Sequence, residues 1–194
     1  MQRHNPVSLA MYHALIKSQE ASTRDELDRL FNDATTLYVG GHLTASLELW
    51  QQARALSEES GDKARKIKAM SNMGALLYAL GELEQAETIQ KEALVYKQMR
   101  GDLAGQAITL GNFGLIQQDK GDWDAALDSF RRAFTLARNV DDLEGAAHHL
   151  AQMAAVYRDR SQWKEAEKLL QEALGLYRQM GANKGEADCL GDLA

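Results

Sequence analysis

Glycines recur along this 194-residue chain at a spacing of twenty residues. Gly41, Gly61, Gly81, Gly101, Gly121 and Gly181 lie on this grid, and Asp141 and Ser161 take its two remaining places. Glycine adopts left-handed backbone without steric cost, and Asp does so more readily than most residues. The grid therefore predicts a regular series of tight turns, which restricts the chain to a repeat architecture.

The neighbours of these turns show that the true period is 40 residues. A bulky apolar residue lies two places after every second grid position: Leu43, Leu83, Trp123 and Trp163. An acid directly follows two of the other turns, at Asp62 and Asp102. Such an acid can accept hydrogen bonds from the free N–H groups that begin a helix. The two kinds of turn thus alternate.

Small residues also recur every 40 positions. One column holds Ser46, Ala86, Ala126 and Ala166, another holds Ala53, Ala93, Ala133 and Ala173, and large residues form a third at Leu30, Met70, Leu110, Leu150 and Leu190. Small residues at fixed places in amphipathic segments indicate where two helices cross closely. Each unit is therefore interpreted as helix A, a turn, helix B and a second turn.

The chain is predicted to be all-α, with about four helix-turn-helix repeats, an N-terminal helix and a C-terminal partial repeat. We expect a capping half-repeat over 1–23, in the register of a helix B, and a repeat array over 24–194. The units of the array lie near 24–60, 61–100, 101–140 and 141–180, with a partial unit at 181–194. A single Pro and few β-branched runs give no indication of strands.

Several motifs resemble the tetratricopeptide repeat (TPR) family in its 40-residue form. They are Asn72-Met73-Gly74 and Asn112-Phe113-Gly114 in helix A, Gly81-Glu82-Leu83 and Gly121-Asp122-Trp123 at the turn, and Ala93-Leu94 and Ala173-Leu174 in helix B. The resemblance covers about 24–194, and the spacing is similar to repeats in spindle-orientation adaptors, kinesin light chains and bacterial TPR regulators. It implies an α-α superhelix, a TPR solenoid, with helix A on a concave side that binds an extended peptide or a partner helix. It also implies that Trp123 and Trp163, at the turns, fill the core rather than stack on a ligand.

Helix A carries a ladder of polar residues 40 positions apart: Asn32, Asn72, Asn112, Gln152 and Asp192. An amide can pair with both groups of a peptide backbone, so the ladder is a candidate clamp for a ligand main chain; it can equally satisfy a neighbouring helix. If helix A faces the groove, further candidates are Tyr38, Tyr78, Lys68, Gln118, His148 and Arg158. Each of these can instead lie on a solvated face without a ligand.

Composition excludes several other functions. The net charge of −6 argues against nucleic acid or an anionic membrane as a partner. The single Cys189 excludes an internal disulfide, and no apolar run approaches the ~20 residues that span a bilayer. Catalytic motifs are absent from the sequence, so we expect a cytoplasmic protein that is not an enzyme and holds no cofactor or metal.

Three functional hypotheses stay open. The first is a scaffold that binds a protein or peptide in the concave groove. The second is a sensory or regulatory segment of a larger bacterial signalling or transcription regulator. The third is self-assembly, including a homodimer through the C-terminal helix, because the chain ends within a helix A that still carries interior-type residues.

Overall fold

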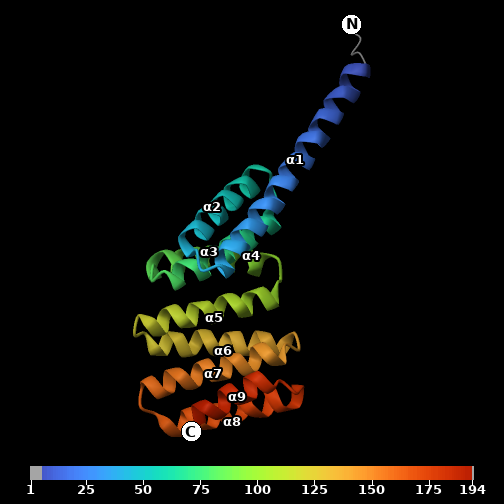
Figure 1. The fold of residues 1–194 in the computed structure, drawn as a ribbon. Helices are drawn as coiled ribbons and strands as arrows, with labels where there is room; N and C mark the ends of the chain where they lie inside the picture. The colour runs from blue at the N-terminus through green and yellow to red at the C-terminus, as the bar shows by residue number, and fades with distance from the viewer. Residues whose placement is uncertain (1–5, 194) are drawn as a thin grey trace. The chain divides into compact units, whose positions relative to one another are not determined.

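The computed structural model describes residues 6–193, with side chains from residue 11 onward, and all secondary structure within this range is helical. Residues 1–5 of the expected cap, and residue 194, lie outside the described residues. The chain divides into two compact units, residues 1–80 and 81–194, which are described separately. The expectation of an all-α chain built from helix pairs is confirmed (Figure 1).

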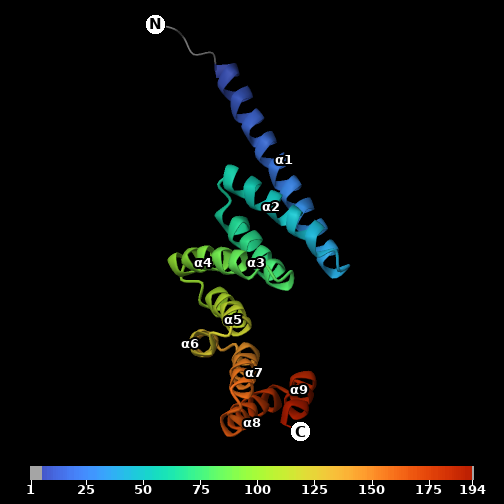
Figure 2. The ribbon, with the colours of Figure 1, turned by 90° about the vertical axis from the view of Figure 1, so that its left-hand side faces the viewer.

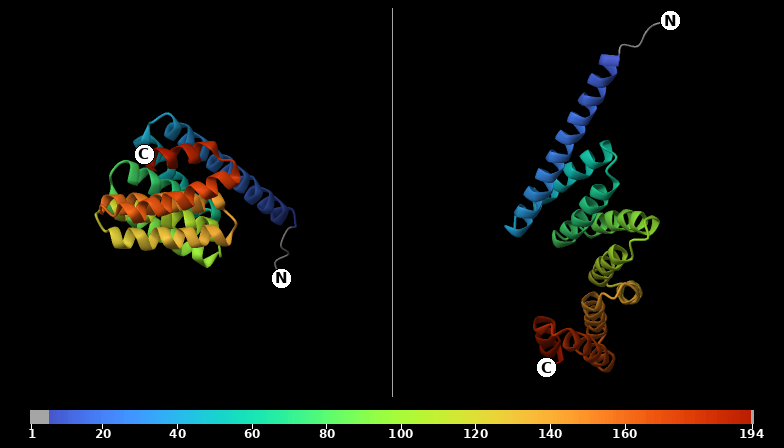
Figure 3. Two further views of the ribbon diagram at one scale, coloured as in Figure 1. Left: turned by 90° about the horizontal axis from the view of Figure 1, so that it is seen from below. Right: turned by 90° about the vertical axis from the view of Figure 1, so that its right-hand side faces the viewer.

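The described part of the first unit, residues 6–80, contains three helices. They are α1 (Pro6–Val39), α2 (Leu43–Glu59) and α3 (Lys63–Ala79). Consecutive helices pack against each other, and α1 extends well beyond the end of α2 (Figure 3). Because α1 runs through residue 23 without a turn, the expected capping segment and the first helix A form one continuous helix.

Residues 81–193 of the second unit form six helices, each packed on the next along the chain. They are α4 (Leu83–Met99), α5 (Leu103–Asp119), α6 (Trp123–Asn139), α7 (Leu143–Asp159), α8 (Trp163–Met180) and α9 (Asn183–Leu193). Helices α5 and α7, both of the A type, also contact each other. In Figure 1 the turns that join α5 to α8 lie at alternate ends of the helices, so consecutive helices run in opposite directions; Figure 2 shows the same helices after a rotation of 90°.

The turns have the geometry that the glycine spacing predicts. Every grid position has a positive φ, including the two that are not glycine, Asp141 at 57° and Ser161 at 58°. The acids after the turns cap the following helices as expected: Asp62 Oδ1 accepts from the backbone N–H of Arg65 at 3.0 Å, and Asp102 Oδ1 accepts from that of Gly105 at 2.8 Å. Turn and cap together set the direction in which each new helix starts.

The small-residue columns lie where helices cross. The alanines of the column from Ala53 to Ala173 have no exposed surface. On α5, a Cβ added at Gly114 would lie only 2.4 Å from Cε1 of Phe130, which is fully buried on α6. Contact this close between two helices requires a residue without a side chain on one of them.

The expectation that the tryptophans at the turns fill the core is wrong. Trp163 is 65% exposed and Trp123 is 40% exposed. Each is the first residue of its helix, α8 and α6 respectively, and therefore lies at the edge of the stack, where the helix pairs do not enclose its ring.

Candidate functional site

The first unit contains a cleft of about 600 Å³ between the middle of α1 and the turn that joins α2 to α3. Its wall on α1 runs from Ile16 to Leu27, and its other wall contains Ser60, Asp62 and Arg65. Charges of both signs line it, so the cleft does not select strongly for an anion or a cation.

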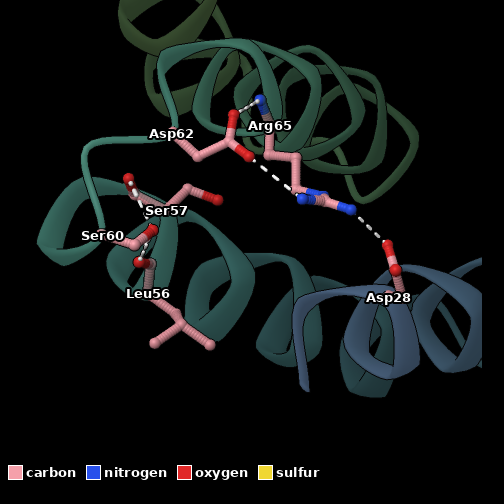
Figure 4. Close-up of polar contacts among 6 residues, drawn as sticks. All are labelled: Asp28, Leu56, Ser57, Ser60, Asp62 and Arg65. Carbon is pink, nitrogen blue, oxygen red and sulfur yellow. Dashed lines mark hydrogen bonds and ion pairs between the residues drawn. The ribbon is translucent and has the colours of Figure 1, made fainter. Parts of the chain in front are cut away.

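Arg65 holds the two walls together (Figure 4). Its guanidinium pairs with Asp28 of α1 and, at 3.1 Å, with Oδ2 of Asp62. The pKa of the Asp62 carboxyl is lowered, chiefly by the hydrogen bond from the backbone N–H of Arg65. Because both acids already occupy the guanidinium, Arg65 positions α1 on α3 and is not an open ligand-binding group.

The predicted groove residues of the first unit lie on α1 and α3. Asn32, Tyr38 and Lys68 are exposed, whereas Asn72 and Tyr78 are half-buried. The Lys68 ammonium lies 5.4 Å from the centre of the Phe31 ring, a cation–π distance. This contact shows that side chains from successive helices A meet within the unit. Tyr78 already has an interaction partner.

Predicted residues of the second unit are linked across successive helices A. Gln118 Nε2 of α5 donates to Asp159 Oδ2 of α7 at 2.6 Å. Arg158 Nη1 of α7 pairs with Asp192 of α9 at 2.7 Å, which joins a predicted basic residue to the last member of the polar ladder. Both polar groups are thus satisfied within the chain, and the charge of Arg158 is offset.

The ladder residues on α5 and α7 differ in their surroundings. Gln152 Oε1 lies 2.8 Å from His149 Nδ1, so this amide has an internal partner. The His149 ring packs against α5 at Gly111, where an added Cβ would lie 2.7 Å from its Cε1 atom. Burial lowers the pKa of His149. Asn112 is half-buried and makes no side-chain hydrogen bond to the described residues, while His148 is exposed.

Sequence reasoning missed Asp159 and missed that Asp192, a member of the predicted ladder, pairs with Arg158. Asp159 lies 41 residues after Gln118, and Asp192 lies 34 residues after Arg158. The first spacing is one residue longer than the 40-residue period and the second is six residues shorter, so each pair joins nearby turns of successive helices A. Pairs of oppositely charged or hydrogen-bonding residues about one period apart in the sequence could therefore have predicted these contacts.

The described residues contain no cluster of three or more His, Cys, Asp or Glu side chains that could hold a metal ion. Cys189 is buried, and burial raises the pKa of its thiol. A thiol in such surroundings is less reactive than an exposed one. Within the same residues, no helix has the length and apolar character needed to cross a membrane.

The comparison with protein families identifies the repeat. Residues 67–98 and 102–194 each match a family described as tetratricopeptide repeat. The chain belongs to the tetratricopeptide repeat family. This confirms the resemblance seen in the Asn-x-Gly and Gly-acid-apolar motifs, and both matches begin at or near the start of a helix A. A sequence comparison with curated proteins finds no match.

Solved structures share the TPR fold at low sequence identity. Aspartyl phosphate phosphatase F from Bacillus subtilis is 14% identical with a TM-score of 0.79, over 85% of this chain and 43% of that one. The Rap conjugation gene regulator of plasmid pLS20, in complex with the Phr* peptide, is 20% identical with a TM-score of 0.72, over 85% and 45%. A Podosopora anserina protein assigned as a kinesin light chain, with nearly identical TPR-like repeats, is 12% identical with a TM-score of 0.65, over 90% and 94%. This TPR chain therefore spans less than half the length of the first two proteins.

Proposed function

We propose that this TPR chain is a non-enzymatic scaffold that binds an extended peptide or a partner helix through side chains of its helices A. The proposal includes the cytoplasmic location and the protein or peptide partner expected from the sequence. It is supported by membership of a family whose repeats mediate protein interactions, and by the likeness to a regulator that holds a peptide.

One observation carries the proposal. The amides of Asn32, Asn72 and Asn112 occupy equivalent places in three successive repeats, and none of them makes a side-chain hydrogen bond to the described residues. Their amide atoms are not among the buried side-chain atoms that lack a hydrogen-bond partner, so they are open to solvent and to a ligand. A ligand backbone would supply the hydrogen bonds that the chain itself does not. Gln152, by contrast, already bonds to His149.

Selection from a random peptide library tests this function. We expect the wild-type chain to enrich extended peptides, and the variant Asn72→Ala/Asn112→Ala to bind them at least about tenfold more weakly, since each lost backbone hydrogen bond contributes roughly 0.5–1.5 kcal/mol. Asn139→Ala is the matched control, because Asn139 is an exposed amide on helix B. Circular dichroism should show the same helicity in all three proteins.

Two results would contradict the proposal. If the library yields no binding peptide, the chain is not a peptide receptor. If the double variant binds the selected peptides as tightly as the wild type does, the asparagines are not the clamp, and the ligand site lies elsewhere.

A second candidate is a ligand-responsive segment of a larger regulator. It is favoured by the observation that the chain spans only 43% and 45% of the two longer structures that it resembles. The sequence of the complete gene tests it: an effector domain in the same reading frame supports this candidate, and a stop codon after residue 194 contradicts it.

A further inference from the structure

The N-terminal half of α1 lies outside the packed part of its unit. With 34 residues α1 is about 51 Å long, whereas the 17 residues of α2 span about 26 Å. From residue 11 to residue 26 no side chain of α1 is buried, and the first buried one is Leu27. Figure 3 shows this part of α1, which we call the overhang (residues 6–22), extending beyond α2.

The overhang presents large apolar side chains to solvent. Met11 is 69% exposed, Tyr12 is 60% exposed and Leu15 is 66% exposed. These residues occupy adjacent turns of the helix, and Ile16 continues them into the cleft beside the turn between α2 and α3. They form a contiguous patch, which is different from the isolated apolar residues found on any protein surface.

The part of the overhang before Lys17 has the composition of a buried helix. Residues 4–16 contain no Asp, Glu, Lys or Arg. The chain has four other charge-free runs of at least this length, 34–47, 69–81, 103–118 and 145–157. The last three form most of α3, α5 and α7, whose buried residues make up much of the core. A helix of this length without a packing partner is only marginally stable in water.

We propose that a second copy of this chain covers the overhang, in a symmetric dimer whose two overhangs pack antiparallel. A symmetric contact places the same surface on both sides, so it requires a surface without like-charge repulsion. Residues 6–16 carry no Asp, Glu, Lys or Arg, and the two charged residues of the overhang, Lys17 and Glu20, have opposite signs, so the overhang satisfies this requirement. The segment likewise offers nothing that would select a strongly acidic or basic partner.

The geometry of the overhang favours the antiparallel arrangement. It places the α2–α3 hairpins of the two copies at opposite ends of the helix pair, so the hairpins do not collide. The two helix dipoles then oppose each other, which is the favourable orientation for neighbouring helices. The N-terminal end of each overhang also comes to lie beside residues 16–24 of the other, where the cleft of about 600 Å³ gives it room.

The dimer is expected to dissociate on dilution. The interface between two helices about 25 Å long buries less accessible surface than the ~1,200 Å² typical of stable specific complexes. Sedimentation of the complete 194-residue chain over about 1–200 µM should therefore show a monomer that becomes a dimer as the concentration rises. Leu15→Glu places a charge in the centre of the contact and should weaken the dimer at least about tenfold.

Leu190→Glu is the matched control. Leu190 is 45% exposed on α9, whereas its counterparts Leu110 and Leu150 are 4% and 2% exposed, so α9 is the rival dimer surface. We expect Leu190→Glu to leave the dimer intact. Ala14→Cys, at the centre of the overlap, should form a disulfide-linked dimer on oxidation, while Val95→Cys on the exposed face of α4 should not.

A chain that stays monomeric over this range overturns the proposal. So does a dimer that survives Leu15→Glu but is lost in Leu190→Glu, because it would then form through α9. Both leucines are exposed, and circular dichroism establishes that each variant is folded. The variant Asn72→Ala/Asn112→Ala should dimerise normally. The dimer and the peptide-binding site can therefore be refuted separately.

Discussion

Replacing Gly114 with alanine probes the closest helix crossing of the second unit. The new methyl group would lie 2.4 Å from Cε1 and 2.6 Å from Cδ1 of Phe130, whereas carbon atoms in contact lie about 3.5–4.0 Å apart. Phe130 has no exposed surface, and buried side chains are closely packed. Overpacking of this kind costs about 1–3 kcal/mol, and the clash of more than 1 Å places Gly114→Ala near the upper end.

The gain in helix propensity offsets part of this cost. Alanine favours a helix interior over glycine by about 1 kcal/mol, so the net loss should be about 2 kcal/mol, which lowers the melting temperature by roughly 4–8 °C in a chain of this size. Gly175→Ala is the control, because nothing lies within 4 Å of the Cβ position on α8. That variant should be more stable than the wild type by about 0.5–1 kcal/mol.

A double variant tests directly whether the clash with the Phe130 ring causes the loss of stability. In the next repeat, Ala154 and Leu170 occupy the places of Gly114 and Phe130, and both are buried. Phe130→Leu alone should cost roughly 1–2 kcal/mol because it leaves a cavity. Combined with Gly114→Ala, it restores a pair that this fold already accommodates. Urea unfolding should show the double variant about 1–3 kcal/mol more stable than the sum of the single effects predicts. Additive losses would refute the argument.

Three further predictions follow from the turns, the columns and the buried histidine. Asp141→Gly should raise the free energy of unfolding, measured by urea titration, by about 0.5–1 kcal/mol, because φ at this residue is 57° and left-handed backbone strains a side chain. An unchanged or lower free energy of unfolding would contradict this. Ala133→Leu should cost about 1–3 kcal/mol, since Ala133 is fully buried at a helix crossing, and an unaltered melting temperature would show that no crossing exists there. Burial lowers the pKa of His149, so the unfolded chain binds more protons below about pH 6.5 and stability should fall as the pH drops from 7 to 5. His149→Gln should make this fall shallower, as thermal melts across that range would show; a fall as steep as that of the wild type would reject the assignment to His149.

Much of the local structure follows from residue type at fixed spacing. A 20-residue grid of glycines predicted the turns, because few other residues adopt a positive φ without strain. Asp62 and Asp102 predicted helix starts, because a carboxylate one residue after the turn meets the free N–H groups of the helix. Both inferences use interactions within four residues of each other, and the structure confirms both.

The candidate site was less accessible to sequence reasoning. The 40-residue period placed Gln152 and Arg158 on helices A, but it did not show that His149 and Asp192 already occupy them. These partners depend on side-chain rotamers and on how far one helix is displaced along the next. A column pattern contains neither quantity, and the asparagine clamp therefore stays a prediction.

The all-α repeat architecture, its period and its turn positions are properties of the sequence alone, because each arises from short-range backbone preferences repeated at equal intervals. The exposure of Trp163, the continuity of α1 past residue 23 and the internal pairing of Arg158 are decided in three dimensions. Burial depends on whether a neighbouring layer is present, and pairing depends on the distance between atoms far apart in the chain. Spacing along a sequence specifies neither, which is why the same column can be buried in one repeat and open to solvent in another.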